Sequence, residues 1–289
     1  MQIQNGSGSK LFGPPSDRNL SKLPWWALFL VIMGLFITIL ISENQHYRET
    51  FTYLKDGIIV TLRITLTAFP IATIIGLFAG LARASKKVIP YNLATIYVEI
   101  VRGIPLIVII LYVAFGLMPV VRDLANKIGI WGLGWGGQFF FAGLFNSLAN
   151  FSIRDISNEL RAEIALAFGY GAFEAEVFRA GIQSIGRGQM EAARSLGMSY
   201  VQAMRYIILP QAIRRVLPPL GNDFIALLKD SSLVTVLAVN ELTQLSRMRR
   251  ASTFRVLETF NVVAFLYLSM TLVLSAGVRL LERVFKYEE

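Results

Sequence analysis

The sequence contains no cysteine, a single histidine and few charged residues. Of its 289 residues, only His46 is histidine and 16% are charged. Without cysteine the chain can form no disulfide, thiolate metal site or cysteine nucleophile. One histidine cannot build a histidine metal cluster, and His46 flanks a hydrophobic segment, so we interpret it as a solvated loop residue. We therefore expect neither a metal site nor a cofactor on this chain.

Motifs for nucleotide hydrolysis and nucleophilic catalysis are also absent. The glycine-rich residues 129–137 lack the Lys-Ser/Thr pair that cradles phosphate in a Walker A loop, and no GxGxxG or Ser-His-Asp pattern occurs. The net charge of +9 could indicate a nucleic-acid partner, but no basic helix or RNA-binding aromatic pattern accompanies it. We predict that the chain is not an enzyme and binds no nucleic acid.

Long hydrophobic runs, in contrast, are abundant. Hydrophobic residues make up 54% of the chain, more than a soluble fold of this size would bury. Charge-free runs of about 20 residues, the length that a membrane span needs, occupy residues 23–42, 64–82, 103–121 and 259–278. Two weaker spans, near residues 161–183 and 216–240, carry charges, as expected of helices that line a polar pathway. The sequence predicts an all-α membrane protein with about six transmembrane helices.

Lysine and arginine orient these spans. With the N-terminus inside, the inner segments carry more basic residues than the outer segments, which is the bias expected for a cytoplasmic side. The cluster of Arg247, Arg249 and Arg250 falls outside and opposes the bias. We predict that both termini, and the segment between the fourth and fifth spans (residues 184–215), are cytoplasmic.

The N-terminal region has two parts. Residues 1–22 are rich in Gly, Ser, Asn and Pro, and we expect them to be disordered in the cytoplasm. The run at residues 23–42 could be a cleaved signal peptide, but its apolar core is long and no small-x-small cleavage site follows it. We interpret it as an anchor helix that is retained.

Residues 128–153 contain no Asp, Glu, Lys or Arg, yet we do not interpret them as a seventh span. Their glycine density disfavours a helix, and irregular backbone exposed to lipid is costly. A span here would also move residues 184–215 to the outside. We interpret residues 119–160 as an external insertion in which residues 139–148 form an amphipathic helix at the membrane interface; a re-entrant loop is the alternative. The glycines are Gly129, Gly132, Gly134, Gly136, Gly137 and Gly143.

The most informative segment is EAARSLGMSYVQAMRYIILP, residues 191–210. Its Ala, Met, Glu, Gln and Arg content favours short helices. Gly197 can end the first helix in the left-handed conformation, and Pro210 is expected to close the second. The pattern predicts a helix–Gly–helix that projects from the membrane and docks on another protein.

Four ordered segments resemble one family of membrane transporters. They are YVEIVRGIPL at residues 97–106, GQMEAARSLG at 188–197, LPQAIRRVLPPLGN at 209–222 and KDSSLVTVLAVNEL at 229–242. Together they resemble the polar amino acid uptake branch (histidine, glutamine and arginine permeases) of bacterial ABC importer permeases, over residues 54–285. The resemblance implies a type I ABC importer permease fold in which residues 184–215 form the cytoplasmic EAA coupling loop.

The resemblance also implies partners and a location. The chain would be the permease subunit of an importer in a prokaryotic plasma (inner) membrane. It would work with two ATPase subunits that carry ATP and Mg²⁺, a second permease copy or homologue, and an external amino-acid-binding protein. The residues implied in ATPase coupling are Gln189, Glu191, Ala192, Ala193, Leu196, Gly197 and Pro210.

Charges expected in the membrane interior mark a candidate substrate path, because each costs about 2.5–3.5 kcal/mol at the bilayer centre. Glu99 and Arg102 share a helix face, and Gly103 with Pro105 weakens the helix just beyond them. A loosened helix frees backbone groups that can bind a polar substrate. The pair either lines the path or forms an intrahelical ion pair, and the two roles are compatible.

The second candidate group lies in the fifth predicted span, and its opposed charges, amide and hydroxyls suit a zwitterion. Cationic groups would meet the α-carboxylate, and Asp223 with Asp230, on nearly one face, would meet the α-amino group. The alternative is an interhelical salt-bridge network at a subunit interface. The candidate residues are Asn222, Asp223, Lys229, Asp230, Ser231 and Ser232.

Two other functions remain open at this point. An ion-gradient-driven carrier or channel would be favoured by inverted repeats and discontinuous half-helices, and we find no internal repeat. A permease that only partners a substrate-holding homologue in a heterodimeric importer is the other alternative. We favour a permease that itself forms the path of an amino acid importer.

Overall fold

The computed structural model describes residues 25–134 and 141–285, and within these ranges every regular element is a helix. Our predictions for residues 1–22, and the part of the expected amphipathic helix before residue 141, lie outside the described residues. The helices are α1 (Trp25–Glu43), α2 (Gln45–Ala84), α3 (Val88–Gly103), α4 (Leu106–Leu111), η2 (Tyr112–Leu117), α5 (Met118–Gly134), α6 (Ala142–Ala149), η3 (Ile153–Asp155), α7 (Asn158–Gln183), α8 (Arg187–Ser195), α9 (Tyr200–Ala203), η4 (Met204–Ile208), α10 (Leu209–Asp230), η5 (Ser231–Leu237), α11 (Leu242–Thr253) and α12 (Val256–Phe285).

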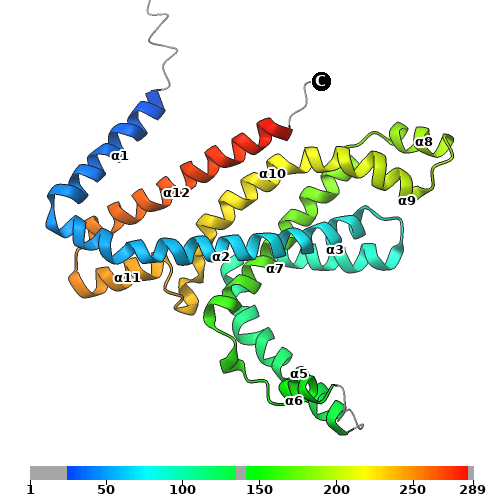
Figure 1. The fold of residues 1–289 in the computed structure, drawn as a ribbon, viewed down its shortest axis with the longest axis horizontal. Helices are drawn as coiled ribbons and strands as arrows, with labels where there is room; N and C mark the ends of the chain where they lie inside the picture. Colours follow the sequence, from blue (N-terminus) through cyan, green and yellow to red (C-terminus); the bar gives the residue numbers. More distant parts are fainter. Residues whose placement is uncertain (1–24, 135–140, 286–289) are drawn as a thin grey trace, which may run out of the picture.

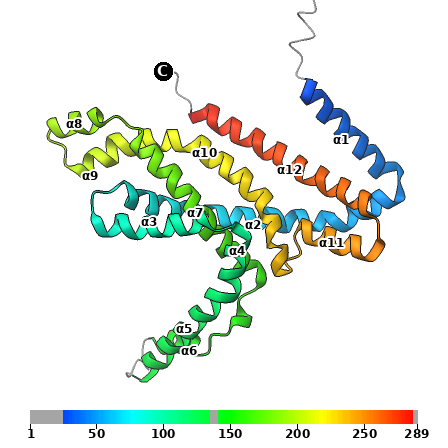
Figure 2. The ribbon, with the colours of Figure 1, turned by 180° about the vertical axis from the view of Figure 1, so that it is seen from behind.

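The long helix α2 organises the molecule. It runs through the bundle, with α7 packed along it; the loop helices α8 and α9 lie at one end of the bundle and α11 at the opposite end (Figure 1 and, from behind, Figure 2). Small residues allow the close contact, as in membrane helix pairs. A Cβ added to Gly76 would lie 2.7 Å from Cβ of Glu174, and one added to Gly80 would lie 2.7 Å from the carbonyl oxygen of Ala175.

Side chains at helix starts explain where several elements begin. Asn44 caps α2 by accepting a hydrogen bond from the backbone N–H of His46 at 2.9 Å; His46 is exposed, but it lies in the first turn of α2 and not in a loop as we expected. Ser157 caps α7 by accepting from the N–H of Leu160 at 3.1 Å. Such caps satisfy amide groups that have no partner inside the helix.

Four of the described helices are long and apolar enough to cross a membrane. They are α1, α2, the continuous helix Leu106–Gly134 and α12 from Val256 to Arg283. The helices α7 and α10 have 26 and 22 residues but carry charges, as the sequence predicted for the two weaker spans. The predicted break near Gly103 and Pro105 is present, since α3 ends at Gly103 and α4 begins at Leu106.

The glycine-rich segment differs from our expectation. We expected the glycine density to disfavour a helix ahead of the amphipathic helix at residues 139–148, but α5 continues to Gly134 and forms a hairpin with α6 (Figure 1). A Cβ on Gly129 would clash with the backbone of Ala149, and one on Gly132 would clash with the ring of Phe145. These glycines therefore permit close contact between two helices, and the contact outweighs their low helix propensity.

Candidate functional sites

The predicted substrate segment lies where a helix changes type. The α-helix α10 ends at Asp230, and the backbone continues as the 3-10 helix η5 from Ser231 to Leu237. Ser231 is buried, and its hydroxyl donates to the carbonyl oxygen of Leu228 at 2.7 Å. Ala238 then adopts the left-handed conformation with φ 53°. The segment that we placed near the middle of a continuous span is thus an interruption of the helix.

The two predicted acids of α10 have different surroundings. The Tyr170 hydroxyl of α7 donates to Oδ2 of Asp230 at 2.7 Å. Oδ2 of Asp223, in contrast, is buried and has no hydrogen-bond partner among the described residues. Asn222 and Lys229 are exposed on another face of α10. The structure therefore separates the predicted group into an acidic side toward α7 and an exposed amide–ammonium side.

A cavity of about 550 Å³ joins two of the predicted site residues. Arg102 of α3 and Asp223 of α10 both line it, together with Arg215 and the ring of Phe173. The guanidinium of Arg102 lies 5.9 Å from the centroid of the Phe173 ring, a cation–π geometry, and it makes no ion pair within the described part of the chain. Cationic and anionic side chains thus face a single space.

Of the two roles considered for Glu99 and Arg102, the intrahelical ion pair is not formed in the structure. Arg83 of α2 donates to Oε1 of Glu99 at 3.1 Å and to Oε2 of Glu176 at 3.0 Å. Arg179 also pairs with Glu176, which lies three residues before it in α7. Arg83 reaches Glu99 from a neighbouring helix, which leaves Arg102 to the cavity.

The sequence analysis did not identify one buried acidic residue. Glu174 of α7 is fully buried against α2, and neither of its carboxylate oxygens makes a hydrogen bond among the described residues. Thr73 lies near it, but the Thr73 hydroxyl donates to the carbonyl oxygen of Phe69 at 3.0 Å. Glu174 is close enough to Asp223 for their charges to interact. Its position within a run of glycine and alanine was the signal that could have revealed a charge at a tight helix contact.

The loop between α7 and α10 has the predicted helix–Gly–helix form. After α8, Gly197 adopts φ 81°, its N–H donates to the carbonyl of Arg194 at 3.0 Å, and the N–H of Met198 donates to that of Ala193 at 3.1 Å. This pair of bonds is the Schellman ending of a helix. Ser199 then starts α9 with a capping box that includes Gln202. Local bonds on both sides of Gly197 therefore define the turn.

The predicted coupling residues are mostly on the outer surface of this loop. Leu196 is 84% exposed although it is a large apolar residue, and Ala193 is the exception because it is buried. The others are also exposed: Gln189, Glu191, Ala192, Gly197 and Pro210. An apolar cluster beneath the loop holds it against α7 and α10; its members are Ile185, Ile208 and Ala212, with Met190 and Met204 packed on them.

Pro210 does not close a helix, contrary to our prediction. The π-helical turn η4 leads directly into α10, and Pro210 lies in the first turn of that helix. Proline has no N–H to donate, and the wider π turn shifts the backbone hydrogen bonds at this point. The loop is therefore joined rigidly to the span that carries Asp223 and Asp230.

Comparison with known proteins agrees with this architecture. Residues 72–287 match the family of binding-protein-dependent transport system inner membrane components, and the chain belongs to that family. The glutamine transport system permease protein GlnP of Escherichia coli (strain K12) is 35% identical over 233 residues, covering 81% of this chain and 93% of GlnP. The probable glutamine ABC transporter permease protein GlnM of Bacillus subtilis (strain 168) is 37% identical over 235 residues, covering 81% and 94%.

Solved structures give the same result. A crystal structure of an amino acid ABC transporter with histidines matches with a TM-score of 0.64 and 35% identity, covering 82% of this chain and 94% of that chain. The inward-facing MetNI methionine ABC transporter matches with a TM-score of 0.61, covering 81% and 96%; at 20% identity it supports the fold alone. The predicted fold class and permease function are confirmed: the chain is a multi-pass membrane permease subunit of the ABC importer type. The family match favours this function over an ion-gradient-driven carrier, despite the interrupted helix at Asp230.

Proposed function

We propose that this chain forms the translocation path of an ATP-driven importer of polar amino acids. The observation that carries the substrate class is the cavity shared by Arg102 and Asp223. The relatives named above include permeases for glutamine and a transporter for an amino acid, which supports the same class.

The chemistry of the cavity suits a zwitterion. Arginine only donates hydrogen bonds and pairs with a carboxylate in a charge-assisted geometry. An ionised carboxylate such as Asp223 only accepts them, and its unpartnered Oδ2 can accept from an ammonium group. Arg102 would therefore hold the α-carboxylate of the substrate and Asp223 its α-amino group. Glu99, Asn222, Lys229, Asp230, Ser231 and Ser232 would form the surroundings of the path.

Partner proteins would supply the remaining parts of the transporter. Two ATPase subunits would bind ATP and Mg²⁺ and hydrolyse the nucleotide, since the 289 residues contain no Walker A motif. They would seat on the exposed loop around Leu196 and Gly197, with both termini on the same, cytoplasmic side. A second permease copy or a homologue would complete the path, and an external binding protein would deliver the amino acid. Closure of the ATPases would favour one of the two permease states through their differential affinity for it.

The coupling role is tested with Gly197→Val in transporter reconstituted with its ATPase. Valine cannot adopt φ 81° without strain, so the turn is lost while insertion of the spans is not affected. We expect ATPase stimulation and transport to be abolished at unchanged membrane content. Normal coupling in this variant would remove the basis of the loop assignment.

The substrate class is tested separately by competition for uptake with arginine, glutamine, glutamate and glucose. Competition by one or more amino acids but not by glucose is the expected result. If glucose competes and no amino acid does, the substrate proposal is wrong even though the coupling result stands.

A further inference from the structure

The end of the molecule opposite the coupling loop carries an unexplained basic helix. The helix α11 and its turn into α12 lie at this end (Figures 1 and 2) and contain Arg247, Arg249, Arg250 and Arg255. Leu242 and Leu245 of α11 pack into an apolar cluster with α2 and α12. The opposite face of α11 is polar and basic. If the coupling loop is cytoplasmic, this charge lies outside, where the charge bias of membrane proteins disfavours it.

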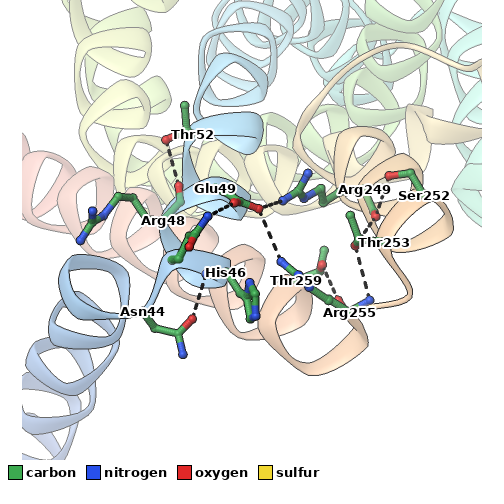
Figure 3. A network of polar contacts seen from close by, with 11 residues as sticks. Asn44, His46, Arg48, Glu49, Thr52, Arg249, Ser252, Thr253, Arg255 and Thr259 are labelled. Carbon is green, nitrogen blue, oxygen red and sulfur yellow. Dashed lines mark hydrogen bonds and ion pairs between the residues drawn. The ribbon is translucent and has the colours of Figure 1, made fainter.

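Two of the four arginines stabilise the fold. Arg249 and Arg255 both bind Oε2 of Glu49 in the first turns of α2, at 3.1 Å and 3.5 Å (Figure 3). The guanidinium of Arg249 also lies 5.7 Å from the centroid of the Tyr53 ring. One carboxylate thus clamps α11 and the following turn against α2.

The other two arginines have no ion-pair partner among the described residues. Arg247 is exposed and makes no polar contact there. Arg250 lies with its guanidinium 5.1 Å from the centroid of the Phe260 ring. Both remain available to an acidic partner.

Phe254, between these arginines and Arg255, is neither buried nor relaxed. It follows the last turn of α11 with φ 58°, and the residue is 86% exposed. Glycine or asparagine is the usual residue at such a left-handed helix ending, and another residue there costs about 1 kcal/mol or more. Neither burial nor backbone conformation explains a phenylalanine here. An exposed aromatic side chain flanked by arginines is typical of the centre of a protein–protein interface.

We propose that Arg247, Arg250 and Phe254 form a docking surface for an acidic face of the soluble protein that delivers the substrate. The inference rests on the proposed function, which requires such a protein. An anionic membrane surface is the less favoured occupant, because a helix that lies on lipid inserts an apolar face, and two of the three large apolar residues of α11, Leu242 and Leu245, pack against the protein while only Met248 is exposed.

The docking surface is connected to the predicted substrate segment. The Thr235 hydroxyl of η5 donates to Oε1 of Gln244 on α11 at 2.7 Å. Glu241, which caps α11, accepts from the Tyr267 hydroxyl of α12 at 3.0 Å. The 3-10 helix η5 in turn begins directly after Asp230. A partner seated on α11 therefore contacts an element that is bonded to the interrupted helix.

The experiment uses the complete transporter in phosphatidylcholine nanodiscs. The probe is the amino-acid-binding protein that stimulates ATP hydrolysis by the unmodified transporter, and its affinity is measured at low and high salt. The variants are the double charge reversal Arg247→Glu with Arg250→Glu, and Phe254→Gly. Arg154→Glu is the matched control, because Arg154 is also exposed and predicted to be external but lies outside α11.

We expect the double reversal to weaken binding at least about tenfold at low salt and less at high salt. Phe254→Gly should weaken binding about fivefold or more, while the unfolding temperature stays the same or rises because glycine tolerates the positive φ. That opposite movement of affinity and stability excludes a merely structural role for Phe254. Arg154→Glu should change the affinity less than about twofold.

Four results would overturn the inference. Equal affinity for the variants and the unmodified transporter would place the docking surface elsewhere. An equal loss with Arg154→Glu would mean that the attraction is non-specific. If the variants weakened binding only in nanodiscs that contain phosphatidylglycerol at one part in four, the three residues would be shown to bind lipid head groups. If no amino-acid-binding protein stimulates the unmodified transporter, the proposed function fails first, and this inference fails with it.

Discussion

The charged side chains between the helices differ in whether a partner compensates their charge. Arg83, Glu176 and Arg179 satisfy one another at the junction of α2 and α7. Asp223 is different, since its buried Oδ2 has no partner among the described residues. Burying such a group is costly, so the fold gains nothing from it. We interpret Asp223 as a residue retained for the substrate.

The first prediction concerns Asp223→Asn. A neutral amide costs less to bury than an unpaired carboxylate, so the free energy of unfolding should stay the same or rise by about 1 kcal/mol. Amino acid uptake should fall about tenfold or more because the acceptor for the ammonium group is weakened. Uptake in proteoliposomes and thermal unfolding measure the two effects. Asp123→Asn is the control: Asp123 is exposed in α5, and its loss should leave uptake unchanged. Unchanged uptake with Asp223→Asn would count against the proposed site.

At the scale of elements, the close contact of α2 with α7 depends on glycine. The second prediction is that Gly80→Ala destabilises the protein by about 1–3 kcal/mol, because the new Cβ would overlap Cβ of Phe178 and the carbonyl of Ala175. Gly277→Ala in α12 is the matched control, since nothing lies within 4 Å of its added Cβ. It should be neutral or stabilising by up to about 1 kcal/mol. Thermal unfolding in detergent measures the stability of both variants, and equal changes in stability would refute the packing argument.

The third prediction concerns the cap of α11. Burial raises the pKa of Glu241 from its ordinary 4.5 to about 7, against the hydrogen bonds that its carboxylate accepts from Thr243, Gln244 and Tyr267. The folded state then binds a proton more tightly than the unfolded state, so the stability that this proton contributes is present below about pH 4.5 and lost as the pH rises toward about 7. The unfolding temperature of the unmodified protein, relative to that of Glu241→Gln, should therefore fall across this window. A constant difference between the two proteins would show that Glu241 does not titrate there.

At the scale of the whole molecule, the two ends of the bundle offer two different surfaces. The coupling loop exposes Leu196 at one end and α11 exposes Phe254 at the other, each strongly exposed for a large apolar residue. The two proposed docking surfaces lie at opposite ends, as the proposed place of the permease between an internal ATPase and an external delivery protein requires. The prediction that the two surfaces lie on opposite sides of the membrane can be tested on this chain.

The fourth prediction concerns that sidedness. The natural sequence has no cysteine, so single cysteines can be labelled without background. In intact cells, Ser252→Cys in α11 and Ser152→Cys before η3 should react with a membrane-impermeant maleimide. Ser195→Cys in α8 should react only after the cells are opened. Labelling of Ser152→Cys only in opened cells would mean that the α5–α6 hairpin is cytoplasmic and that the number of spans must be revised.

Short-range patterns in the sequence determined the class of protein and the form of its coupling loop. Hydrophobic runs predicted the spans, and the turn at Gly197 followed from local chemistry, since its hydrogen bonds join residues no more than five positions apart. The ordered motifs at residues 97–106, 188–197, 209–222 and 229–242 are by themselves enough to indicate the family.

Only the tertiary structure decided which charges pair and which glycines permit close contact. Arg83 bonds to Glu176 across 93 positions of the chain, Tyr170 to Asp230 across 60, and Glu174 is buried by a helix that lies far away in the sequence. Propensity and spacing describe a residue relative to its own helix. The partner that a buried charge finds, and the backbone that a glycine allows to approach, belong to another helix, so they are defined only when the helices pack.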